Sequence, residues 1–348
     1  MEEEVGARQP LRQYATTIPL FVIYYRTVLE TNSQLLFERY IYIPPLNSSM
    51  LGGVEMGKVH KPFIVLFITA VLSLAIALPA PLITVRAANP SVTDSDNGVW
   101  SVGAMYINAY SSCQCSANDL QCCDDAASYI LTLPGFRQGF LLADGAVTDL
   151  ALIDKTYGGA DDVYADSVDL LLFAGHGDVD NLYVCNSRFG CCVTPSMMRL
   201  GDKDLEWFIV DSCKALKSMY DDLINSPWIK AFKGLHAVAG FATTVPDVDA
   251  TYVCIFSWCF RTGYACGLRE KYFVNYFSSG ETFATAWLKA TKEALSYVGF
   301  EEPIISCVFG PWDDKTQSYG IYDAPYKGYL TNDVYSPVYF MGMCTTIG

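Results

Sequence analysis

Two segments decide the fold: Asp169-Leu-Leu-Leu-Phe-Ala-Gly-His-Gly177 and Leu205-Glu-Trp-Phe-Ile-Val-Asp-Ser-Cys213. Each is a short apolar run that ends in a reactive side chain. Runs of this length, bounded by glycine or polar residues, are typical of strands that are buried on both faces. Buried parallel strands predict an α/β sheet.

The reactive residues at the ends of these two runs are His176 and Cys213. In open α/β sheets, ligands bind in the crevice beyond the carboxyl ends of the strands, where both residues would lie. A histidine and a cysteine in such a crevice supply a thiol nucleophile and its proton acceptor. We therefore predict Cys213 and His176 as catalytic residues.

The rest of the chain after residue 88 alternates between strand and helix patterns. A third apolar strand is expected at 235–243. Helical stretches are expected at 118–133, 213–224, 250–277 and 281–298. This alternation predicts a mostly parallel sheet flanked by helices.

The chain contains 13 cysteines, all after residue 112. Such density downstream of an apolar segment predicts an oxidising compartment and a disulfide-stapled domain. Because the number is odd, one thiol remains if all others pair. We expect it to be Cys213, since this cysteine alone follows a buried strand and faces the crevice.

Residues 62–87 are typical of a signal peptide or a signal anchor. Basic residues precede an uncharged stretch from Pro62 to Val85, and Val85-Arg86-Ala87 offers a small-residue cleavage site. The stretch is also long enough to span a bilayer, which needs about 20 residues. Both readings predict that residues 88–348 form an α/β domain outside the cytoplasm, either secreted or membrane-anchored.

Residues 1–61 form an N-terminal extension without a chemical motif. It is either a short cytoplasmic tail or not translated, because Met56 offers an alternative start directly before the basic residues.

The formal net charge of the chain is −14. This charge argues against nucleic acid as a partner, because nucleic-acid binding requires a basic face. An acidic surface favours cationic substrates. The expected partner is a peptide or protein substrate, with membrane contact only through 62–87 if that segment is not cleaved.

The two blocks resemble the caspase-like superfamily of cysteine peptidases, which includes caspases, metacaspases, legumains, gingipains and clostripain. Phe-Ala-Gly-His176-Gly177 and Val-Asp211-Ser212-Cys213 stand 37 residues apart and are closest to metacaspases. The chain also resembles an uncharacterised family of secreted prokaryotic proteins that share these blocks and a later Gly-Phe-Ala-Thr-Thr, here at 240–244. The residues after Cys213 depart from the metacaspase pattern, with Lys-Ala-Leu in place of His-Ser-Gly.

The resemblance implies a caspase-like α/β fold and a cysteine endopeptidase. Cys213 would attack the scissile carbonyl as a thiolate, and His176 would protonate the leaving amine. The N–H groups of Gly177 and Cys213 would stabilise the oxyanion. If Cys213 also opens a helix, the helix N-terminus lowers the pKa of its thiol.

Asp211 is the predicted substrate-binding residue. Residues two apart on a strand share a face, which places the Asp211 carboxylate about 6–7 Å along the strand from Cys213. As the resemblance to metacaspases implies, it would receive a Lys or Arg side chain before the scissile bond. The alternative is that Asp211 caps a helix beginning near Cys213.

A non-catalytic surface domain of the same fold, which binds protein or glycan, is the alternative function, because fold alone does not establish catalysis. No spacing typical of a metal or cofactor site occurs, so we expect neither. His236 is a packed residue at a strand start, a partner of the site, or a zinc ligand with His176 and Cys213.

Overall fold

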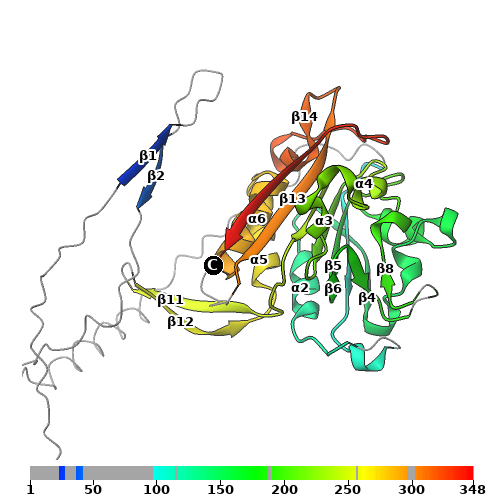
Figure 1. The fold of residues 1–348 in the computed structure, drawn as a ribbon, viewed down its shortest axis with the longest axis horizontal. Coiled ribbons are helices and arrows are strands. Elements are labelled where there is room, and N and C mark those ends of the chain that lie inside the picture. The colour runs from blue at the N-terminus through cyan, green and yellow to red at the C-terminus, as the bar shows by residue number, and fades with distance from the viewer. Residues whose placement is uncertain are drawn as a thin grey trace, which may run out of the picture. The chain divides into compact units, whose positions relative to one another are not determined.

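The computed structural model describes residues 97–347 except 114–116, 187, 189, 256–257 and 296–301, together with the backbone of two short N-terminal strands (Figure 1). For residues 250–264 only the backbone is described. The chain forms two compact units, Met1–Ile83 and Thr84–Gly348. In the first, β1 (Ile23–Thr27) pairs antiparallel with β2 (Phe37–Ile41). The signal or anchor predicted at 62–87 lies outside the described residues, and the helices that are described are all too short or too polar to cross a membrane.

An eight-stranded sheet forms the centre of the second unit, in the order β14-β13-β10-β9-β5-β3-β4 with β15 paired to β13. The strands are β3 (Ser101–Tyr106), β4 (Arg137–Ala143), β5 (Leu170–Ala174), β9 (Trp207–Asp211), β10 (Ala237–Phe241), β13 (Ile304–Asp313), β14 (Ser318–Tyr319) and β15 (Phe340–Ile347). From β4 to β10 all neighbours are parallel. β13 runs antiparallel to β10, and β14 and β15 run antiparallel to β13. The predicted mainly parallel α/β sheet is therefore confirmed.

The central strands are buried on both faces because apolar side chains alternate between two cores. Leu170, Leu172 and Ala174 of β5 pack into one core. Leu171 and Phe173 pack into the other. This double burial explains why these strands read as continuous apolar runs in the sequence.

Helices cover both faces of the sheet (Figure 1). The first core is closed by α2 (Cys123–Ile130), α5 (Leu268–Ser278) and α6 (Phe283–Leu295). The second is closed by α3 (Lys217–Asp221), α4 (Trp228–Ala231) and a region of short 3-10 turns. The described 3-10 turns are Tyr110–Ser112, Asp144–Ala146, Asp149–Ala151, Lys155–Tyr157, Asp161–Val163, Ala165–Ser167, Pro195–Met197 and Leu223–Asn225, together with Gly320–Tyr322 and Pro325–Lys327, which pack into the first core through Ile321 and Tyr326.

Two predicted helices are wrong in part. The stretch 250–277 begins as a hairpin of β11 (Asp249–Ile255) and β12 (Trp258–Ala265), and only its end is helical. The helix expected from residue 213 begins at Lys217, after a turn. Beyond β5 the chain forms a small sheet of β6 (Gly177–Asp178), β7 (Asn181–Tyr183) and β8 (Cys192–Val193).

Three disulfides join described residues, and they link Cys113 to Cys185, Cys122 to Cys266 and Cys307 to Cys344. Cys213 is free, as predicted, but Cys123 and Cys192 are free too. The expectation of a single free thiol is therefore wrong. Cys123 lies in the first core, where a cysteine packs as a small apolar side chain and has no need of a partner.

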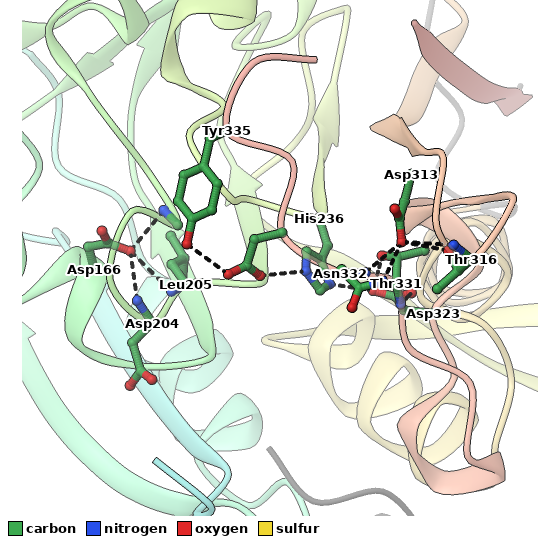
Figure 2. Close-up of polar contacts among 12 residues, drawn as sticks. Asp166, Asp204, Leu205, His236, Asp313, Thr316, Asp323, Thr331, Asn332 and Tyr335 are labelled. Atoms are coloured by element: carbon green, nitrogen blue, oxygen red, sulfur yellow. Dashed lines mark hydrogen bonds and ion pairs between the residues drawn. The ribbon is translucent and has the colours of Figure 1, made fainter. Parts of the chain in front are cut away.

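His236 is the packed residue at the start of β10. It is 2% exposed, and its two ring nitrogens lie 2.7 Å from Asp323 Oδ2 and 3.2 Å from Asp333 Oδ1. Figure 2 shows the His236 ring beside Asp323, and the hydroxyl of Tyr335 donates to Asp333 at 3.1 Å. Although burial alone would lower it, the two carboxylates raise the pKa of His236 to about 9. The imidazolium therefore ties β10 to the chain segment that follows β14.

This ion pair predicts a loss of stability at alkaline pH. The folded pKa is about 9 and the ordinary value 6.5, so the stabilisation is complete below pH 6.5 and disappears as the pH rises through 9. The loss should be about 3 kcal/mol. Urea unfolding at pH 6 and pH 9.5 gives the free energy of unfolding of the wild type and of His236→Gln. We expect the difference between the two proteins to be smaller at pH 9.5 by this amount. A difference in the free energy of unfolding that is equal at both pH values would contradict the ion pair.

Candidate active site

His176 and Cys213 reach one pocket from neighbouring strands. In the pairing of β5 with β9, Ala174 lies opposite Asp211, so each reactive residue stands two positions beyond the last register pair. Both line a narrow pocket with an empty volume of about 380 Å³, and both also line a wider one next to it. The structure thus brings together the two residues that the sequence singled out, and their catalytic roles stay a prediction.

The imidazole of His176 is oriented by two groups that the sequence did not reveal. Its Nε2 lies 2.7 Å from the backbone carbonyl oxygen of Asn118. Because a carbonyl only accepts, Nε2 carries the proton, and in the neutral ring Nδ1 is the acceptor. The Tyr110 ring packs against the imidazole at 4.8 Å between centroids. The Tyr110 hydroxyl accepts from the His176 N–H at 2.8 Å and donates to the Tyr183 carbonyl at 3.0 Å.

Disulfides flank the loop that carries the Asn118 carbonyl. On one side Cys113 is bonded to Cys185, and on the other Cys122 is bonded to Cys266. A backbone carbonyl is present at every residue, so no side-chain pattern could have pointed to this one. The loop is held at both ends, and this fixes the acceptor for His176.

Cys213 is a half-buried thiol in a turn, not at a helix N-terminus. Its Sγ lies 3.4 Å from both the backbone N and the backbone O of Val245. The next residue, Lys214, has a positive φ of 55°, and helix α3 begins only at Lys217. The expected assistance from a helix dipole is therefore wrong. Burial raises the pKa of the Cys213 thiol, so the thiol depends on a base to lose its proton.

Two backbone N–H groups are available beside the thiol. The N–H of Tyr183 donates to the His176 carbonyl at 3.0 Å, which makes these two residues a hydrogen-bonded pair of the antiparallel ladder. Antiparallel pairs alternate, so the next pair, Gly177 and Leu182, is a non-hydrogen-bonded pair. The Gly177 N–H therefore points away from β7. The N–H of Cys213 makes no hydrogen bond within the described part of the chain. These are the two donors that the sequence analysis assigned to the oxyanion.

The predicted substrate-binding residue, Asp211, already has an internal cation. Arg269 Nη1 lies 2.8 Å from Asp211 Oδ1, and Arg269 Nε lies 2.8 Å from Asp249 Oδ1. All three side chains are almost fully buried. Glu270 is buried beside them, and burial, followed by the nearby Asp211 charge, raises the pKa of its carboxyl far above the ordinary value. Asp211 therefore lines the pocket as one half of an ion pair and does not cap a helix.

Residues 105–297 match the model of a family described as a domain of unknown function, DUF6345. The chain belongs to the DUF6345 family. A comparison with curated proteins gives no match. The matched segment of the DUF6345 domain contains every residue of the candidate site, from Tyr110 to Arg269.

Gly177 is required by the geometry of the site. A Cβ at this position would lie 2.1 Å from Ser212 Oγ and 2.9 Å from the backbone oxygens of Asn181 and Cys213. We expect Gly177→Ala to lower the free energy of unfolding by about 1 to 3 kcal/mol, because backbone atoms must move. Denaturant unfolding measures this change. Gly145→Ala is the control, since a Cβ there meets nothing within 4 Å, and equal effects of the two changes would contradict the crowding at Gly177.

The ion pairs of Arg269 make a second stability prediction. Arg269→Met leaves Asp211 and Asp249 as buried carboxylates without their cation, which costs about 3 to 5 kcal/mol. Lys289→Met is the control, because its pair with Glu281 is solvent-exposed at 51% and 32% and is worth less than about 1 kcal/mol. Urea unfolding at pH 7 compares the two. If Arg269→Met lowers the free energy of unfolding no more than Lys289→Met does, the buried cluster does not depend on its arginine.

Proposed function

We propose that this DUF6345 protein is a caspase-like cysteine endopeptidase that uses a Cys213–His176 dyad. The supporting observation is that both side chains line one pocket, where the contact of Nε2 with the Asn118 carbonyl leaves Nδ1 as the ring nitrogen that can accept a proton, and that two backbone N–H groups are unengaged. A nucleophile, a base and an oxyanion site thus lie together at the carboxyl ends of parallel strands. The mainly parallel sheet is consistent with the proposed superfamily.

The proposed reaction needs only groups of this chain and the substrate. His176 Nδ1 takes the proton of the Cys213 thiol, and the sulfur attacks the scissile carbonyl carbon. The N–H groups of Gly177 and Cys213 donate to the oxyanion. The C–N bond breaks as His176 returns the proton to the leaving amine. Water then attacks the thioester with His176 as base, which releases the acid and restores the thiol.

The compartment and the substrate preference are further parts of the proposal. Disulfides persist in oxidising compartments, and those at the site support a domain that is secreted or membrane-anchored outside the cytoplasm. The acidic net charge of −14 supports cleavage after Lys or Arg.

Removal of either member of the dyad should abolish cleavage. We expect Cys213→Ala and His176→Ala each to reduce kcat/KM for peptide substrates by at least about a thousandfold, because a nucleophile and its base act as one unit. Cys192→Ala is the matched control, since Cys192 is also a free, partly exposed cysteine but lines neither pocket at the dyad. Fluorogenic peptides ending in Arg, Lys, Asn or Asp provide the assay. A Cys213→Ala protein that still cleaves would place the chemistry elsewhere.

Alkylation separates an enzyme from a binding domain of the same fold. In the proposed enzyme, iodoacetamide labels Cys213, and His176→Ala slows this labelling because the thiolate loses its base. In a binding domain, Cys213 would be labelled at the same rate in the wild type and in His176→Ala. Peptide mapping without reduction gives the site of labelling, and Cys192 serves as the internal reference.

A further inference from the structure

The narrow pocket beside Cys213 combines apolar walls with charged groups. Its lining includes the apolar side chains of Leu120, Val245 and Pro246 and the charged side chains of Asp211, Asp247 and Arg269. The two carboxylates differ in their partners, and this difference decides which of them can receive a ligand.

The Asp211 carboxylate is already engaged. Arg269 is 3% exposed and is fixed by Asp211, by Asp249 and by the Pro246 carbonyl oxygen, which lies 3.3 Å from Nη2. A cationic ligand at Asp211 would have to compete with this guanidinium, which is anchored on three sides. Asp211 therefore serves as the counter-ion of Arg269.

Asp247 has no such counter-ion. Its oxygens accept the backbone N–H groups of Gln121 and Cys122, and within the described part of the chain no Lys, Arg or His forms an ion pair with it. The two N–H groups fix the carboxylate in position but leave its charge uncompensated. Arg269 bonds to the carbonyl of the preceding residue, Pro246, and so holds the backbone that carries Asp247.

The pocket suits a long side chain with an apolar stem and a cationic head. Both kinds of lining group lie on the walls of this one pocket, beside Cys213. The methylene stem of an arginine or lysine would pack along Leu120, Val245 and Pro246, as such stems do on apolar surfaces. The head would then meet the one carboxylate of the lining that lacks an internal cation.

We propose that Asp247, and not Asp211, is the specificity-determining residue of the site. Its carboxylate receives the guanidinium or ammonium of the substrate residue that precedes the scissile bond. This assignment rests on the proposed peptidase function for the place of the scissile bond, whereas the recognition of a basic side chain by the pocket can be measured without catalysis.

The test compares two peptides that differ only in charge, one with arginine and one with citrulline before the scissile bond. We expect the ratio of their kcat/KM values to fall by about tenfold or more in Asp247→Asn, because a charge-assisted hydrogen bond is lost. The Gln121 N–H donates to Oδ2 and the Cys122 N–H to Oδ1, so asparagine keeps an acceptor for one of the two, and the citrulline peptide reports any effect of losing the other. Asp221→Asn, which removes the same charge from an exposed position on α3, should leave the ratio unchanged.

A binding measurement in the Cys213→Ala background separates the two proposals. Calorimetry should show that adding Asp247→Asn raises the Kd of the arginine peptide by about tenfold and leaves the Kd of the citrulline peptide unchanged. Selective binding without cleavage by the wild type would overturn the peptidase and keep the Asp247 pocket. Cleavage whose arginine preference is unchanged in Asp247→Asn would keep the peptidase and overturn the pocket, and the absence of both binding and cleavage would overturn both.

Discussion

The buried guanidinium of Arg269 joins the three chain segments that form the floor of the site. It contacts Asp211 at the end of β9, Asp249 at the start of β11 and the carbonyl of Pro246 between them. The ion pair with Asp211 fixes the end of the strand that leads into Cys213, and the carbonyl contact fixes the segment against which the thiol packs. Removal of one partner of a buried ion pair is costly, so the three segments stabilise one another through Arg269.

The sheet and the two reactive residues could be predicted because their signals are local. Strands β5, β9 and β10 are buried on both faces, so each reads as an uninterrupted apolar run. The carboxyl ends of parallel strands meet at one edge of the sheet. The proximity of His176 and Cys213 could therefore be predicted from the sequence. The same reasoning did not find β4, because this edge strand is largely exposed and its apolar residues do not form a run.

The remaining parts of the site depend on contacts that have no local signal. Arg269 is 58 residues from Asp211, and an arginine in a helix pattern reads as a solvated side chain. The hairpin of β11 and β12 was mistaken for a helix, although Thr251-Tyr-Val-Cys-Ile255 is rich in β-branched and aromatic residues, which favour strands. The Asn118 carbonyl is a backbone group, and only the folded loop selects it. The sequence thus predicted which two side chains line the pocket, whereas their orientation and electrostatics depend on long-range packing.

Of the three disulfides between described residues, two lie beside the site and the third joins β13 to β15. The strands β5 and β9 need no covalent link, because both faces are packed with apolar side chains. In the loop from Cys113 to Cys122, Ala117 and Leu120 pack against the cores, and the bonds to Cys185 and Cys266 additionally restrict the unfolded ensemble. Because this loop holds the acceptor of His176, these two disulfides act on the orientation of the His176 ring. Disulfides persist only under oxidising conditions, so the orientation of the His176 ring depends on such conditions.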